Sequence, residues 1–253
     1  MIENCGLGAG NLVLSATLTA SSSAGTLPVS NLGSAQGSAS YAWRALVTNA
    51  SVTLDLATPS AVRVVSIHRT NLTGRSTWTL ALWTGNTLTW TQTAPTRCTN
   101  GQAVWILPKG LTASRIVLTL NDPDNPDGFL SVPLMYAGDL WQPVRNFSTS
   151  STSSFTLGVD EATALSGAEF PQMRWIQRKL SIAHQSYGAA EVPTLLSLQR
   201  LAATGTNILF VPDPGSSTPE TDSLFGRLSG GEIGNPFGAA DRRSWTFTHT
   251  ERL

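Results

Sequence analysis

The sequence predicts a mainly β protein, in which an N-terminal β-sandwich or jelly roll is followed by a smaller α+β sheet domain with one helix. Three observations predict this fold class. Residues 50–120 contain short runs of alternating apolar and polar residues, separated by Gly, Asn and Pro turns. A polar stretch with no apolar residue to bury, "STSSTSS", follows Phe147. Beyond this stretch, several strand-like runs surround one segment with helical spacing.

The N-terminal strands are expected from their period of two. In "SVTLDL" the apolar residues Val52, Leu54 and Leu56 share one face, and "STWTLALW", "TLTWTQT", "AVWILP" and "SRIVLTL" continue the pattern. Residues 62–67, which are almost all β-branched or apolar, predict a central strand. Many short strands at regular spacing are typical of a sandwich or jelly roll. The glycines of "GLGAGN", residues 6–11, lack the spacing of a phosphate-binding loop, and we expect a flexible N-terminal arm there.

The polar stretch after Phe147 marks the expected domain boundary. Its composition favours a flexible linker at 147–158 over a strand edge within one domain. We therefore expect a jelly-roll domain at 1–146 and a sheet domain at 159–253.

The C-terminal part begins with "MRWIQRKLSIAH", which alternates like a strand. "EVPTLLSLQRLAATG" then predicts a helix, with Pro193 in its first turn and Gly205 past its end. "NILFVP", "LFGRL" and "RRSWTFTHTERL" predict three further strands. We expect Trp175, Trp245 and Phe247 in the core of this sheet. The segment 213–223, "DPGSSTPETDS", is too polar for burial and is expected to be an exposed loop.

Composition excludes several classes of protein. Only 13% of the 253 residues are charged, the net charge is zero, and Lys occurs only at Lys109 and Lys179. A nucleic-acid binder needs a clustered basic surface, which this sequence lacks. No stretch approaches the roughly 18 apolar residues of a membrane span. A secretory signal begins with a basic region, and this sequence has no basic residue before Arg44. Cys5 and Cys98 are expected to be ordinary thiols.

Candidate chemistry is sparse, and we expect no enzyme activity and no cofactor. The three histidines lie in separate segments without metal-ligand spacing, and no paired carboxylates or nucleophile motif can be recognised. The acidic segment "NDPDNPDGF" has the residue types of a plain turn, which we favour, and also those of a calcium loop. Its candidate metal ligands are Asp122, Asp124 and Asp127.

Three segments together resemble the discoidin-type (coagulation factor 5/8 C-type, galactose-binding-like) jelly roll: "LPVSNLGSAQGSASYAWRA", "SVTLDLATPSAVRVVSIHRTNLTGRSTWTLALW" and "SRIVLTLNDPDNPDGFLSVPLMYAGDLWQP". An "NL" segment precedes the Trp43 and Arg44 pair, a strand with Leu54–Leu56 follows, and a β-branched strand ends near Asn71. The resemblance covers about residues 10–143. The ending "GFLSVPLMYAGDLWQPVRNFS" is similar to variants of this jelly roll in tail proteins of long-tailed bacteriophages. The C-terminal part loosely resembles the ring-forming sheet domain of phage distal-tail and baseplate proteins, although the two domains stand in the reverse order.

This resemblance implies a structural component of a phage tail tip or baseplate, made in the host cytoplasm and located in the virion. It would form a homo-oligomeric ring around the tail axis, contact other tail proteins, and link the tail tube to the host-recognition apparatus. Within the polar loop, Asp213, Thr218 and Asp222 are the expected subunit contacts. The alternative is a carbohydrate-binding module for cell-surface glycans, and an enzyme acting on cell-wall glycans is a weaker third reading. The loop-end residues that would hold the glycan in that alternative are Trp43, Arg44, His68, Arg69 and Asn71.

Overall fold

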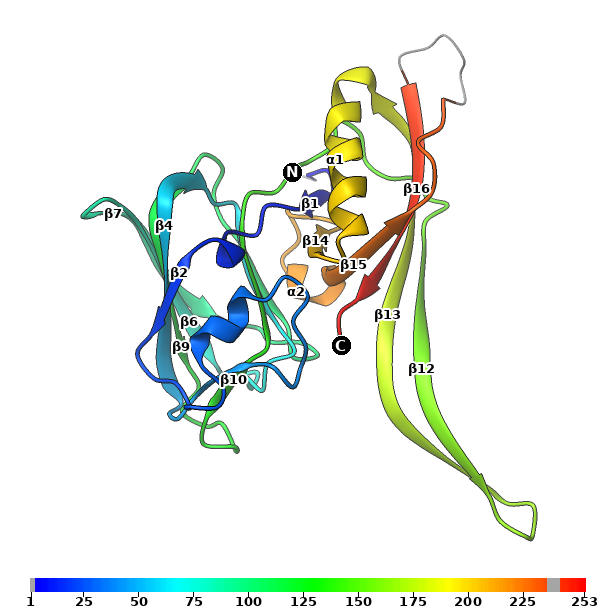
Figure 1. Cartoon of the computed structure of the whole chain (residues 1–253), viewed down its shortest axis with the longest axis horizontal. Coiled ribbons are helices and arrows are strands. Elements are labelled where there is room, and N and C mark those ends of the chain that lie inside the picture. The colour runs from blue at the N-terminus through cyan, green and yellow to red at the C-terminus, as the bar shows by residue number, and fades with distance from the viewer. Residues whose placement is uncertain (1–2, 236–241) are drawn as a thin grey trace.

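The computed structural model describes residues 3–235 and 242–253. They form a jelly roll and a second, six-stranded sheet that lie side by side, with a long hairpin projecting from the second sheet (Figure 1). The predicted fold class, a mainly β protein with one substantial helix in its C-terminal part, is confirmed. None of the helices formed by the described residues is long and apolar enough to cross a membrane.

The jelly roll consists of two main antiparallel layers and a short accessory pair of strands. The five-stranded layer has the order β2 (Thr17–Ala20), β4 (Asn49–Ala61), β9 (Thr112–Asn121), β6 (Thr77–Thr84) and β7 (Thr87–Pro95). The three-stranded layer has the order β11 (Leu134–Gly138), β5 (Val64–His68) and β8 (Ala103–Ile106). The accessory pair is β10 (Leu130–Val132) with β3 (Trp43–Ala45).

Alternation of apolar residues explains why these strands form a sandwich. Val52 and Leu54 on β4 point inward and are fully buried, and they pack with residues of the opposite layer such as Val65 and Ile67 on β5. Strand β5 is also buried on its other face, where Val64 joins a separate apolar cluster. A strand covered on both sides needs apolar residues without alternation, as the run "VRVVSI" provides. The prediction of a central strand at 62–67 is confirmed, since β5 lies between β11 and β8.

The second sheet has strands from both ends of the chain. Its order is β1 (Gly6–Gly8), β14 (Asn207–Val211), β15 (Leu224–Gly230), β16 (Arg242–Glu251), β13 (Glu169–Gly188) and β12 (Thr152–Thr163). The expectation of a flexible N-terminal arm at residues 6–11 is wrong, because Leu7 pairs with Phe210 and also bridges Trp141. A Cβ atom at Gly6 would overlap the side chain of Leu140, so the close approach of this strand requires glycine.

Helix α1 (Val192–Ala203) covers one side of this sheet (Figure 1). Its buried residues Leu195 and Leu198 pack with Trp245 and Phe247, and both aromatic residues lie in the core as predicted. Pro193 stands in the first turn, and Gly205 follows the helix in the left-handed conformation that ends many helices. The remaining helical segments are short: η1 (Leu12–Leu14), η2 (Val29–Gly33), η3 (Ala189–Glu191) and α2 (Pro219–Asp222).

Two predictions for the C-terminal part are wrong. Most of the expected linker at 147–158 belongs to strand β12, because its Ser and Thr residues pair with β13 as a long ladder instead of remaining free. Trp175 is not a core residue: it lies on the projecting hairpin and is 42% exposed. Its alternating neighbours predict the strand correctly, but this part of the sheet has no second layer to bury it.

Candidate functional site

The most distinctive surface is the projecting part of the hairpin, residues 152–178, which we call the arm. Strands β12 and β13 pair over its whole length and extend well beyond the body of the molecule (Figure 1). The arm exposes eight large apolar residues, from Ile176 at 40% to the tip residue Leu165, which is fully exposed. They are Phe155, Leu157, Val159, Leu165, Phe170, Met173, Trp175 and Ile176.

These apolar residues occupy both faces of the arm. Directly paired residues of antiparallel strands share a face, so Leu157 and Ile176 lie together on one face. Phe170, paired with Ala162, lies on the opposite face, together with Trp175. Trp175 pairs with Gly158, where a Cβ atom would overlap the indole ring. Glycine at this position therefore lets the indole lie flat across the neighbouring strand.

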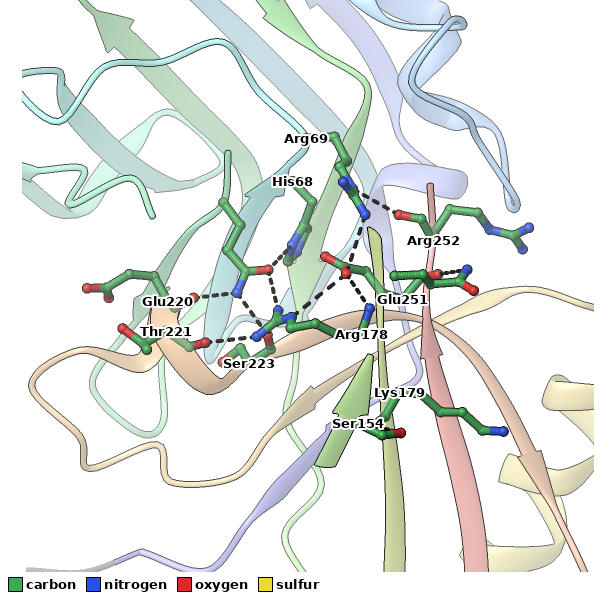
Figure 2. Close-up of polar contacts among 12 residues, drawn as sticks. His68, Arg69, Ser154, Arg178, Lys179, Glu220, Thr221, Ser223, Glu251 and Arg252 are labelled. Carbon is green, nitrogen blue, oxygen red and sulfur yellow. Dashed lines mark hydrogen bonds and ion pairs between the residues drawn. The ribbon is translucent and has the colours of Figure 1, made fainter. Parts of the chain in front are cut away.

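A polar cluster holds the base of the arm against the jelly roll (Figure 2). Arg178 donates from Nη1 to the carbonyl of Thr221 at 2.8 Å and from Nη2 to the carbonyl of Ser223. The carboxylate of Glu251 accepts the backbone N–H of Arg178 at 3.0 Å and lies 3.3 Å from the guanidinium of Arg69, which belongs to the jelly roll. The arm, the chain end and the jelly roll therefore meet in one ion-pair network.

His68 lies at the centre of the same junction. Gln102 donates its amide N–H groups to the carbonyls of Glu220 and Ser223, which leaves its oxygen to accept from Nδ1 of His68 at 3.0 Å. Nε2 of His68 then accepts the hydroxyl of Ser66 at 2.8 Å. Burial lowers the pKa of His68 to about 3, and the charges of Arg178 and Arg69 act in the same direction. His68 is therefore a neutral structural residue at pH 7.

The five residues expected to bind a glycan do not converge on one open pocket. The indole N–H of Trp43, which is buried, donates to the carbonyl of Ser22 at 3.0 Å. The guanidinium of Arg44 lies 4.3 Å from the ring centre of Phe129. Arg69 and His68 belong to the junction described above, and the amide of Asn71 bonds Asp127, Phe129 and Ser131. His68, Arg69 and Asn71 lie at the end of strand β5 as predicted, where the second sheet covers part of that end, whereas Trp43 and Arg44 lie within strand β3.

The expected calcium ligands are not brought together either. Asp122 is fully buried, and its carboxylate accepts bonds from the backbone N–H and hydroxyl of Thr73 and from the amide of Asn125. Asp124 is exposed beside Arg75, and Asp127 accepts from Asn71. Within residues 3–235 and 242–253, no group of three or more His, Cys, Asp or Glu side chains is placed to hold a metal ion. The segment is a turn stabilised by its own side chains.

The polar loop at 213–223 packs against the jelly roll of the same chain. Arg97 donates to the carbonyl of Ser217, and Glu220 and Ser223 are buried, so the expectation of a wholly exposed loop is wrong. Asp213 is half-buried and its carboxylate caps Gly215, whereas Thr218 and Asp222 are exposed. Gln102 and Arg178 donate to the buried backbone carbonyl of Ser223, and these hydrogen bonds offset the cost of removing the polar segment from water.

A cleft of about 590 Å³ lies beside this loop. Half-buried Trp105 and the polar residues Gln92, Arg97 and Glu220 are among its lining residues. Trp105 stacks on Trp78 with ring centres 5.1 Å apart, so one side of its indole is covered.

No protein-family model matches the sequence, and no curated protein matches it. Over about half its length the chain matches solved structures of carbohydrate-binding modules with a discoidin-like jelly roll. A fucose-binding module of Streptococcus pneumoniae is 15% identical, with 51% of this chain and 98% of that chain covered and a TM-score of 0.41. The family 32 module of C. perfringens NanJ, solved with galactose, is 16% identical, with 52% and 98% covered and a TM-score of 0.40. The lectin domain of lectinolysin, solved with Lewis b antigen, is 14% identical, with 51% and 95% covered and a TM-score of 0.41.

Proposed function

We propose that this protein is a structural subunit of a long-tailed phage tail tip or baseplate, where it assembles as a symmetric ring around the tail axis and links the tail tube to the host-recognition apparatus. The observation that carries the assembly role is the arm, with apolar side chains on both faces. The phage setting rests on the sequence resemblance of the segment that leads out of the jelly roll.

The exposed area of the arm supports an assembly role. Eight large apolar side chains at roughly half exposure leave on the order of 800 Å² per arm, about what one partner contributes to a standard protein interface. This area is divided between the two faces of the arm, so a partner must cover both faces to bury all of it. Removing these apolar side chains from water favours the association of the arm with another surface.

The edge strand of the arm supports the same conclusion. Strand β12 is the last strand of the six-stranded sheet, and it contains no Lys, Arg or Pro. Lysine and proline are among the residues with which natural proteins protect exposed edges, since an open edge pairs with other chains, and the charges on β12 are limited to Asp160 and Glu161. A zero net charge also removes the long-range repulsion between copies that keeps many proteins monomeric.

The test is the oligomeric state of the purified chain, by native mass spectrometry and light scattering. The wild type should form a closed oligomer, and the double variant Leu157→Ser, Met173→Ser should be monomeric and folded. The control is Leu88→Ser, which removes an exposed apolar residue (43%) from β7, outside the arm, and should leave the oligomer intact. A wild type that remains monomeric at all concentrations, or that fails to join purified phage tails, would overturn the proposal.

Carbohydrate binding is the second candidate function, and the cleft beside Trp105 is the observation that favours it. A partly exposed indole with amide, guanidinium and carboxylate groups nearby is a combination that suits a sugar ring and its hydroxyl groups. Retention on a glycan array that is lost in Trp105→Ala and kept in His68→Gln would support binding in this cleft. Absence of retention for the wild type would remove this candidate.

A further inference from the structure

The chain carries an apolar groove as well as an apolar arm. The groove has a volume of about 880 Å³ and lies between helix α1 and the end of strand β15. Its apolar lining includes Leu196, which is 42% exposed, Ala203, Leu228 and Ile233. The helix that forms one wall of the groove lies at the end of the sheet opposite the arm tip (Figure 1).

We propose that the tip of the arm of one copy, residues Leu165 to Met173, seats in the α1–β15 groove of a second copy. This inference rests on the proposed assembly role and names the surface that receives the arm. A protrusion and a matching hollow on the same chain form a head-to-tail contact, which closes into a ring or continues as a stack according to the rotation between copies.

The shape of the groove matches the two-faced character of the arm. A flat surface would cover one face only and would leave either Phe170 or Met173 in water. The groove has two walls, helix α1 on one side and residues 228–233 on the other. Gln199 on α1 donates its side-chain amide N–H to the carbonyl of Gly231 at 2.8 Å across the groove, so a ribbon that enters between the walls has both faces covered once it displaces this hydrogen bond.

Charges at the two surfaces are also compatible. Asp160 and Glu161 flank the apolar part of the arm on β12, and Arg174 flanks it on β13. The groove is bordered by one cation and one anion, Arg227 and Glu232. Arg174 pairs with Asp160 on the arm itself, which leaves the carboxylates of Glu161 and Glu169, and Arg227 is the cation that the groove can offer to them.

Disulfide trapping between two different single variants tests whether the arm tip binds in the α1–β15 groove. In a Cys98→Ser background, which leaves only the buried Cys5, one protein carries Leu165→Cys and the other Leu196→Cys. After mixing and oxidation with copper phenanthroline, we expect a covalent dimer that contains one chain of each kind. Replacing Leu196→Cys by Leu88→Cys, on the far sheet of the jelly roll, should reduce this dimer at least tenfold.

The outcomes separate this inference from the assembly role. If Leu165→Cys links mainly to itself, the arms pair by two-fold symmetry and the groove is not the seat. If oligomers form and neither disulfide is found, the arm tip does not bind in the groove, and the proposed assembly role is unaffected. If Leu196→Glu leaves the oligomer intact while Phe170→Glu dissolves it, the arm contacts another surface. If the chain is monomeric throughout, the assembly role and the seat both fail.

Discussion

The carboxylate of Glu251 accepts the backbone N–H of Arg178 at 3.0 Å, and its other close partner is the guanidinium of Arg69, 3.3 Å away. One side chain near the chain end therefore joins the base of the arm to the jelly roll. Together with the pairing of β13 with β16 from Lys179 onward, this contact holds the base of the arm in one direction relative to the rest of the molecule (Figure 2).

Arg178→Ala should destabilise the protein by about 2–4 kcal/mol, because it removes the guanidinium that donates to the carbonyls of Thr221 and Ser223 and that lies 3.8 Å from the carboxylate of Glu251. The measurement is the midpoint of urea unfolding. The control is Arg174→Ala, since Arg174 pairs with Asp160 in solvent and such pairs contribute only about 0–1 kcal/mol. Equal effects of the two substitutions would show that the contacts of Arg178 stabilise the folded protein no more than an exposed ion pair does.

Trp245→Ala should cost about 3–5 kcal/mol, the usual cost of removing a fully buried aromatic side chain. Trp175→Ala should cost less than about 1 kcal/mol in the monomer, because the indole is 42% exposed and lies only over Gly158. Thermal unfolding of dilute monomer measures both changes. A large loss from Trp175→Ala under those conditions would mean that the indole is buried within a single chain.

Stability should fall as the pH decreases from about 6.5. Burial lowers the pKa of His68 to about 3 and that of His249 to about 4, whereas both residues titrate near 6.5 in the unfolded chain. Below 6.5 the unfolded chain binds protons that the folded chain does not, so each histidine removes up to about 1.4 kcal/mol per pH unit. Urea midpoints between pH 7.5 and 5 measure the slope, and His68→Gln should make it shallower. A slope unchanged by this substitution would contradict the burial of His68.

Gly6→Ala should destabilise the protein by about 1–3 kcal/mol, since the added Cβ meets the side chain of Leu140. Gly10→Ala is the matched control, because a Cβ there meets no atom within 4 Å. Unfolding midpoints of the two variants measure the difference. Equal stability would indicate that strand β1 is not held against the side chain of Leu140.

Asp122→Ala should cost about 2–4 kcal/mol, because it leaves the donors of Thr73 and Asn125 unpaired in a buried site. Asp124→Ala, at an exposed position, should have almost no effect. Adding millimolar calcium should leave the thermal midpoint of the wild type unchanged. A calcium-dependent rise that Asp122→Ala abolishes would restore the metal site.

Local patterns in the sequence predicted the C-terminal elements well. Helix α1 has its Pro and Gly signals at both ends, and β14, β15 and β16 follow from short apolar runs. The pattern around Trp175 is equally strand-like, but local alternation does not indicate whether a second layer exists to cover it. Strand β1 was missed because three residues, two of them Gly, carry almost no strand signal and pair only through a distant partner.

The site was harder to predict than the fold. His68 and Arg69 stand at a strand end, where ligands often bind, and only tertiary structure reveals that the second sheet occupies that position. The arm could not be predicted from the sequence for a similar reason. Its serine-rich start has the composition of a linker, and the pairing of Ser154 with Lys179 depends on residues 25 positions away.

Strand β1 also determines how the chain can be divided. It contributes the outermost strand of a sheet whose other five strands begin after residue 151, and it is held there by β14 and Trp141. A fragment that starts at residue 147 would expose the edge of β14 and the apolar surface that Leu7 covers, so it should aggregate. Adding the first dozen residues as a separate peptide should rescue its solubility. The second sheet therefore depends on a strand from the N-terminus, and the boundary between the two parts of the molecule does not fall at a single point in the sequence.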